Sequence, residues 1–206
     1  MIRYVHNLIF LSLGFFFFPA FLFAHEGSVG GLIAGLSHPV LGLDHLLAMV
    51  SVGIISFQLG GKAIWSVPVT FVAVMAIGGI LGMLDIGLIA IELGIALSVL
   101  VLGLTIALNS SFNKLLIYLF VALFATFHGY AHGLEIPELA ASWSYVIGFM
   151  SGTTLLHLLG VGIGYFSRKL KNGTVVLRYT GAIVSGIGFH IIFIIIEVQD
   201  NFILLQ

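Results

Sequence analysis

The chain has 206 residues, of which 60% are hydrophobic and only 7% are charged, and its mean hydropathy is +1.23. Soluble domains carry about a quarter charged residues, so this composition excludes an ordinary soluble domain and indicates a polytopic membrane protein. The formal net charge of -1 gives no basis for a nucleic-acid partner, and the lack of cysteine excludes disulfides and thiolate ligands.

The first 24 residues have the features of a secretory signal peptide. A basic residue, Arg3, precedes an apolar run, and the segment ends in Ala24. We predict cleavage after Ala24. Leu22 is larger than the small residue usual at that position, so an uncleaved anchor is the alternative. Cleavage would make His25 the mature N-terminus.

Residues 25–206 are predicted to form a single all-α transmembrane bundle. A glycine-rich stretch over 27–37 is too short to cross alone and predicts a half-helix or re-entrant segment before the first full span. Pro39 suits the first turn of the next helix, which makes His38 a helix-entry residue. Six spans are predicted after the signal peptide, over 40–59, 64–83, 86–108, 115–133, 143–166 and 177–198.

The loop charges predict the orientation of the chain in the membrane. Acidic residues fall on one side, at Asp85, Glu135, Glu138 and Asp200. Basic residues fall on the other side, at Lys62, Lys114, Arg168, Lys169, Lys171 and Arg178. The positive-inside rule makes the basic side cytoplasmic, so the mature N- and C-termini both lie outside a bacterial-type inner (plasma) membrane.

Small residues recur at four-residue spacing within the predicted spans. This spacing lets helices approach closely in lipid, so we assign these residues to packing and not to chemistry. The pairs are Gly94 and Ser98, Gly148 and Gly152, Gly160 and Gly164, and Gly181 and Ser185.

The first polar cluster is His38, Asp44 and His45, within a sequence that has few polar side chains. On a continuous helix His38 and His45 share a face, while Asp44 is rotated by about 100°. All three can bind one ion only if the chain bends near Pro39 or Gly42. Alternatively, Asp44 hydrogen-bonds a histidine and fixes its tautomer, or the cluster is ordinary polar decoration of a helix start.

The second polar cluster is His128, His132 and Glu135. A continuing helix aligns all three, which is how one helix offers two imidazoles and a carboxylate to a single ion. If Gly133 ends the helix, Glu135 becomes a loop ligand or gate. Because ionisable groups inside a bilayer are costly and usually functional, two such clusters at the same depth predict a metal site.

Other polar residues add to these clusters. Glu92 lies in the outer part of the third predicted span and is a candidate counter-charge. His157 shares a face with Thr153 and is either a second ion station or an interhelical hydrogen-bond partner. His25, beside Glu26, would capture ions outside the membrane.

The ligand types narrow the choice of ion. Imidazole and carboxylate donors without thiolate suit Ni²⁺, Co²⁺ or Zn²⁺ and disfavour Cu(I). An Mg²⁺ or Ca²⁺ site would be built from oxygens. We therefore predict no prosthetic group; the partners are a divalent transition-metal ion and the lipid bilayer.

Several motifs together resemble the HupE/UreJ family over nearly the whole chain. They are His25-Glu-Gly, His38-Pro-x-x-Gly-x-Asp44-His45-Leu-Leu-Ala-Met, Gln58-Leu-Gly-Gly, Glu92-x-Gly-Ile-Ala-x-Ser98, Phe127-His128-Gly-x-Ala-His132-Gly-x-Glu135 and Leu156-His157. The family is associated with nickel and cobalt permeases. The resemblance implies functional roles for His38, Asp44, His45, Glu92, His132, Glu135 and the aromatic Phe71.

The predicted function is a permease that imports Ni²⁺ or Co²⁺, not an enzyme. The alternatives are an intramembrane zinc-dependent hydrolase and a metal-sensing accessory subunit. The predicted metal-site residues, in the extracytoplasmic half, are His25, His38, Asp44, His45, Glu92, His128, His132, Glu135 and His157.

Overall fold

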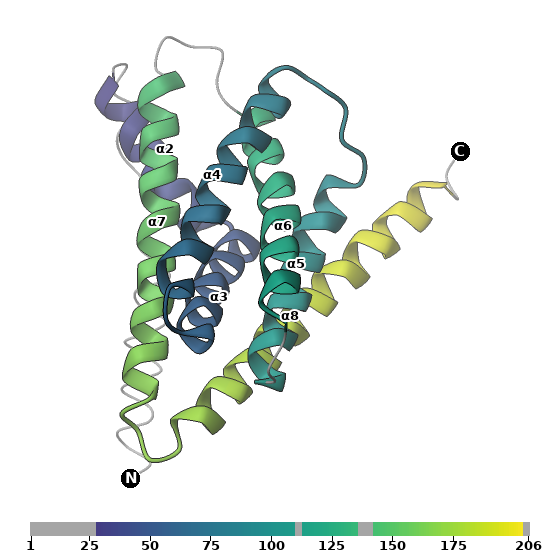
Figure 1. The fold of residues 1–206 in the computed structure, drawn as a ribbon. Coiled ribbons are helices and arrows are strands. Elements are labelled where there is room, and N and C mark those ends of the chain that lie inside the picture. The colour runs from purple at the N-terminus through teal and green to yellow at the C-terminus, as the bar shows by residue number, and fades with distance from the viewer. Residues whose placement is uncertain (1–27, 110–112, 136–141, 204–206) are drawn as a thin grey trace, which may run out of the picture.

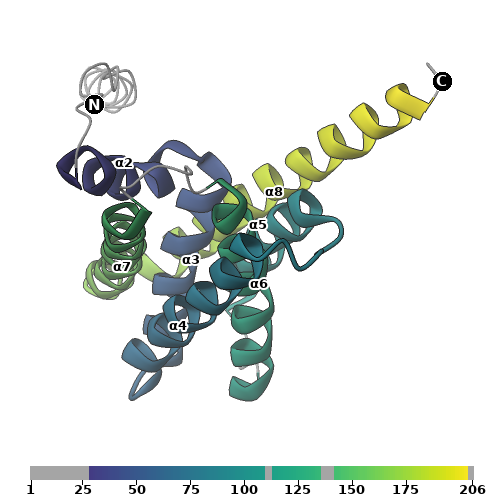
Figure 2. The ribbon, with the colours of Figure 1, turned by 90° about the horizontal axis from the view of Figure 1, so that it is seen from above.

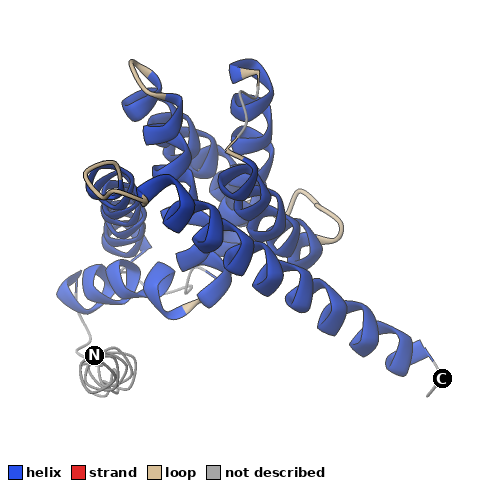
Figure 3. Ribbon diagram, turned by 90° about the horizontal axis from the view of Figure 1, so that it is seen from below, coloured by secondary structure: helices blue, strands red, loops and turns tan. Residues whose placement is uncertain are grey.

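The structure, a computed structural model, describes residues 28–109, 113–135 and 142–203. Within these residues every regular element is a helix, which confirms the all-α prediction (Figures 1 and 3). The helices are α2 (Ser28–Leu41), α3 (Leu43–Leu59), α4 (Ala63–Met83), α5 (Ile91–Leu108), α6 (Lys114–Glu135), α7 (Ser142–Ser167) and α8 (Gly173–Ile203). The predicted signal peptide and His25 lie outside the described residues.

The apolar helices agree closely with the predicted spans. Helices α4 to α8 provide 5 candidate spans, each long and apolar enough to cross a bilayer. Helices α2 and α3 pass the same test only together, as a pair bent by 82°, which would make up to 6 spans. The predicted bend is therefore present, and it falls at Gly42 rather than Pro39.

Two predicted helix starts were wrong. The first full helix begins at Leu43 instead of residue 40, because Gly42 is extended (φ -81°, ψ 113°) and separates it from α2. Helix α5 begins at Ile91 instead of residue 86, because Ala90 before it adopts a left-handed conformation (φ 55°) that interrupts a helix.

The predicted role of Pro39 was also wrong. Pro39 lies inside α2 and His38 lies in the last turn of α2, so neither starts a helix. Helix α2 packs along α7, and a Cβ built on Gly152 of α7 would lie 3.0 Å from the Pro39 ring. This contact accounts for a proline at the end of α2, where the missing N–H removes only one helical hydrogen bond.

Helix α3 is the centre of the bundle. It contacts each of the other helices in the described part of the chain, as Figure 2 shows from above. Its middle is buried on all sides, which a soluble amphipathic helix would not show. The buried residues are Ala48, Met49, Ser51, Val52, Gly53, Ile54, Ile55 and Ser56.

Small residues allow the helices to touch backbone to backbone, as predicted. A Cβ on Gly129 of α6 would overlap the carbonyl oxygen of Met75 in α4. A Cβ on Gly160 of α7 would likewise overlap the carbonyl oxygen of Val50 in α3. Because backbone cannot move aside as a side chain can, these contacts fix how α6 and α7 present their histidines.

The two ends of the bundle carry opposite charges. The α4–α5 connection, at the top of Figure 1, contains Asp85, and we call this the acidic end. The α7–α8 connection, at the bottom, contains Arg168, Lys169 and Lys171, and we call this the basic end. Helix α8 packs mainly on α5 and runs obliquely across the bundle, so that its C-terminal part projects from it (Figures 1 and 2).

Candidate metal-ion site

The break between α2 and α3 brings the first polar cluster together. His38 lies in the last turn of α2 and Asp44 in the first turn of α3, on either side of Gly42. A Cβ on Gly42 would lie 3.0 Å from His45 Nδ1 and 3.1 Å from Asp44 Oδ1. A residue without a side chain therefore lets the chain turn without crowding the Asp44–His45 pair.

Asp44 fixes the orientation of His45. Its Oδ1 accepts a hydrogen bond from the backbone N–H of His45 at 2.8 Å and lies 2.8 Å from His45 Nδ1. Because a carboxylate only accepts, the proton of the neutral imidazole belongs on Nδ1. The lone pair of His45 is then on Nε2, which is buried and has no hydrogen-bond partner among the described residues. This arrangement agrees with the alternative in which Asp44 fixes a histidine tautomer.

His128 is held in the same way by the backbone of its own helix. Its Nδ1 donates to the carbonyl oxygen of Phe124, one turn earlier, at 3.0 Å. The Nε2 atom of His128 is buried and lacks a partner within the described part of the chain. An imidazole that donates through one nitrogen and leaves the other free is typical of a metal-ligating histidine.

Four imidazoles from three helices meet at this place, and we call His38, His45, His128 and His132 the imidazole cluster. The ring centroid of His132 lies 4.8 Å from that of His38 and 4.5 Å from that of His45. The ring centroids of His45 and His128 are 4.8 Å apart. The cluster is deep, because His128 is 0% and His132 only 3% exposed.

Aromatic residues of α7 close one side of the cluster. The ring of Phe149 lies 4.0 Å from that of His132, and the ring of Tyr145 lies 5.9 Å from that of His38. A mostly apolar cavity of about 320 Å³ between α4, α6 and α7 borders the cluster at His132. Nothing in the sequence marks these aromatics, since apolar residues fill every span.

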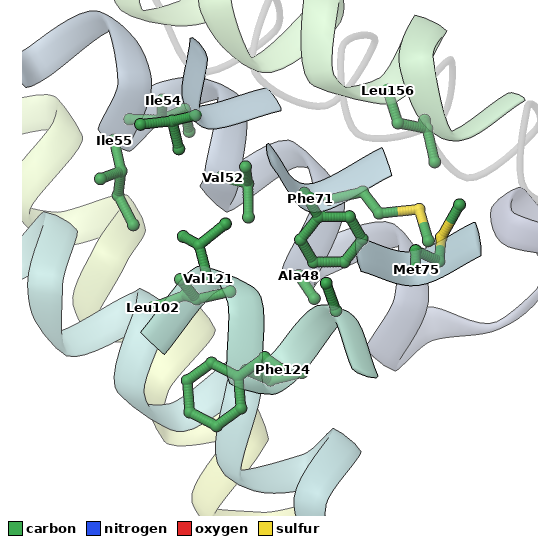
Figure 4. Close-up of a cluster of buried hydrophobic side chains, with 14 of the residues drawn as sticks. Ala48, Val52, Ile54, Ile55, Phe71, Met75, Leu102, Val121, Phe124 and Leu156 are labelled. Atoms are coloured by element: carbon green, nitrogen blue, oxygen red, sulfur yellow. The ribbon is translucent and has the colours of Figure 1, made fainter. Parts of the chain in front are cut away.

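Phe71 of α4 contacts both His128 of the imidazole cluster and His157 of α7. The ring centroid of Phe71 lies 5.6 Å from that of His128 and 5.1 Å from that of His157. Phe71 is fully buried beside Met75 and Ala48 (Figure 4). Among the described residues, no ring contact joins His157 to the four imidazoles, and Phe71 is the ring that contacts both His157 and His128.

The bundle is closed between this region and the basic end. Val52, Ile55, Leu102 and Val121, from three helices, are buried in one hydrophobic core (Figure 4). We call these four residues the inner apolar layer. Because α3 and α5 run toward the basic end and α6 starts there, an ion in the imidazole cluster faces apolar packing in that direction.

Two further predicted site residues, Glu135 and Glu92, lie in the described helices α6 and α5. Helix α6 continues to Glu135, so Gly133 does not end it, and the backbone of Glu135 lies one turn after His132. The side chain of Glu135 lies outside the described part. Glu92 is exposed in the first turn of α5, and no hydrogen bond or ion pair between Glu92 and the cluster is found among the described residues.

The described side chains of the cluster do not form a complete coordination sphere for a metal ion. No group of three or more His, Cys, Asp or Glu side chains in the described residues is arranged to hold a metal ion. The structure instead brings together four imidazoles, two of which have an oriented, buried Nε2. Binding of an ion requires these rings to turn toward a common point.

Comparison with known proteins identifies the family of the chain. Residues 13–191 match the family described as HupE / UreJ protein. The chain belongs to the HupE/UreJ family. This HupE/UreJ protein is 45% identical over 168 residues to Protein HupE of Rhizobium leguminosarum bv. viciae, which covers 81% of this chain and 87% of the relative. No solved structure matches the chain. It is thus a multi-pass membrane protein of a family associated with nickel and cobalt transport.

Proposed function

We propose that this HupE/UreJ protein is a permease that imports Ni²⁺ or Co²⁺ through the imidazole cluster. The observation that carries this proposal is the pair His45 and His128. Each has Nδ1 engaged by an oxygen and Nε2 buried without a described partner, and the two rings are 4.8 Å apart. Neutral imidazole nitrogen is a preferred ligand of both ions.

The incomplete coordination suits transport. A permease must release the ion it binds, so ligands that close only partly around the ion lower the barrier to leaving. In this proposal His38 and His132 complete the set, and Asp44 orients His45 without binding the ion. Glu135, His25 and Glu26 would capture the ion outside, and Glu92 would add negative charge near the entrance.

The charge asymmetry between the two ends of the bundle supports import rather than export. The positive-inside rule would place the basic end in the cytoplasm, the imidazole cluster in the extracytoplasmic half and both mature termini outside. An inside-negative membrane potential then favours entry of a dication by about 4.6 kcal/mol per 100 mV, twice the value for one charge. Import driven by this potential needs no ATP.

Uptake of labelled nickel and cobalt by cells tests the proposal. The variants His45→Ala and His132→Ala should reduce uptake to background at unchanged membrane expression. His190→Ala is the matched control, because His190 is exposed on α8 and should leave uptake unchanged. Near-normal uptake in both cluster variants would contradict the proposal. A hydrolase or a sensor subunit would bind metal without carrying it across.

A further inference from the structure

We infer that His157 is an inner binding station for the transported divalent ion, beyond Phe71 and apart from the imidazole cluster. This inference rests on the proposed function. No ring contact or hydrogen bond between His157 and the cluster is found among the described residues, so the inference divides the path of the ion into two binding steps.

The first observation is that His157 is buried without hydrogen bonds. It is 1% exposed, and neither ring nitrogen has a partner among the residues the structure describes. A neutral imidazole carries one donor and one acceptor, and each buried group left unsatisfied costs about 1–3 kcal/mol. A histidine kept for packing would be expected to find a partner, as His128 does with the Phe124 carbonyl.

The second observation is the chemistry around His157. Thr153 lies one turn earlier on α7, and its hydroxyl is 3.9 Å from the sulfur of Met75. Both Thr153 and Met75 are buried, and Phe71 lies one turn from Met75 on α4. The neighbourhood therefore offers imidazole nitrogen with hydroxyl oxygen and thioether sulfur nearby, and no acidic side chain of the described residues is found in contact with it. Imidazole suits nickel and cobalt, and a set without carboxylates would bind a dication weakly.

The third observation is depth. A Cβ on Gly53 of α3 would overlap the carbonyl oxygen of His157, so these two residues lie at the same level. Gly53 follows His45 by eight residues, which is roughly 12 Å along a helix. An ion at His157 has therefore moved along α3 toward the basic end from the level of His45.

These positions give the order of the path from the acidic end. The ion binds in the imidazole cluster, passes the Phe71 ring and binds at His157, which lies at the level of the inner apolar layer. The transfer is a ligand exchange: the bonds from His38, His45, His132 and finally His128 to the ion break, and a bond from a ring nitrogen of His157 forms. No electron or proton needs to be transferred, because all of these imidazoles bind in the neutral form.

Equilibrium binding of Co²⁺ to the purified full chain tests this inference. His157→Leu removes the nitrogen atoms that would bind the ion and replaces the imidazole ring by an apolar side chain of similar size. His157→Gln keeps a donor atom at a similar reach and provides a second variant if leucine does not pack. The matched control is His190→Leu, on the exposed face of α8.

We expect the wild type and His190→Leu to bind two Co²⁺ ions per chain and His157→Leu to bind one. Uptake into proteoliposomes should fall at least tenfold in His157→Leu and less in His157→Gln. The melting temperature of His157→Leu should stay unchanged or rise, whereas a structural histidine would give a lower one. Two ions and wild-type uptake in His157→Leu would overturn the inner station and leave the permease proposal intact. A wild type that neither binds nor transports cobalt would overturn both.

Discussion

The half of the bundle toward the acidic end contains the imidazole cluster, whereas the half toward the basic end is packed with apolar side chains. Toward the acidic end, α3 begins with Asp44 and His45 and meets histidines of α2 and α6. Toward the basic end, the same helix contributes Val52 and Ile55 to the inner apolar layer, where they are buried in one hydrophobic core. Along α3, candidate metal ligands therefore give way to apolar packing within about two turns.

The difference shows how a membrane protein places polar groups at depth. His38 and His45 lie on either side of the backbone interruption, and the 82° bend at Gly42 allows residues of α2 and α3 to face the histidines of α6. Non-helical backbone at membrane depth is tolerated where it lines a site inside the protein. The apolar half has no such interruption in α3 and contains no histidine of the cluster.

The largest expected effect is on nickel uptake, and it distinguishes the imidazole cluster from the inner apolar layer. His132→Ala should abolish nickel uptake, a fall of about 100-fold or more, with little change in stability, because it removes a ligand. Leu102→Ala in the inner apolar layer should destabilise the protein by about 2 kcal/mol and leave Ni²⁺ affinity unchanged. Uptake and thermal unfolding of both variants in the same detergent check this. Equal loss of affinity in Leu102→Ala would mean that the halves are not functionally distinct.

A smaller effect is expected at the residue that orients His45. Asp44→Asn keeps the shape but loses the negative charge that fixes the His45 tautomer, so Ni²⁺ affinity should fall about 10- to 100-fold. Binding is measured by titration calorimetry on the purified chain, with Asp85→Asn, in the acidic-end loop, as control. An Asp44→Asn variant with wild-type affinity would show that Asp44 does not orient the ligand.

The helix break should be sensitive to a single methyl group. Gly42→Ala adds a Cβ about 3 Å from both Asp44 and His45 and favours a continuous helix over the break. We expect a several-fold loss of uptake without unfolding. Gly162→Ala, at a glycine with open space around its Cβ position, is the control and should behave as wild type. Unaltered uptake in Gly42→Ala would mean that the bend does not position the site.

The smallest effect is expected from hard cations. Mg²⁺ requires octahedral oxygen coordination, which the imidazole cluster does not offer, so a tenfold excess of Mg²⁺ should change nickel uptake by less than twofold. Co²⁺ at the same excess should compete strongly. Inhibition by Mg²⁺ as strong as that by Co²⁺ would place the selective step at carboxylates such as Glu135 or Glu92 instead of the histidines.

Much of the architecture follows from the sequence. Apolar runs and loop charges predict helices α4 to α8 within a few residues, because length and hydropathy dominate in a bilayer. Gly42 and Pro39 both suggested a bend, but only packing decides between them. Contact of Pro39 with Gly152 in α7 keeps the proline inside α2, and this contact between distant residues leaves no local signal.

The site was predictable in composition but not in geometry. The spacing of His128 and His132 on one helix and the nearby Asp44–His45 pair identified the residues of the imidazole cluster. The sequence analysis named His157 as a possible second ion station, but it could not show that Phe71 of another helix contacts both His128 and His157, because these residues are far apart in the chain. The hydrogen bond from His128 to the Phe124 carbonyl joins residues four apart on one helix, so it could have been predicted from the sequence.

The most direct test of the central claim is flux of labelled Ni²⁺ into proteoliposomes containing the purified full chain under an imposed potential. The wild type should take up nickel at a rate that rises with inside-negative potential, and His45→Ala should give the flux of protein-free vesicles. Binding of nickel without flux in the wild type, or flux that persists in His45→Ala, would contradict a permease that works through the imidazole cluster.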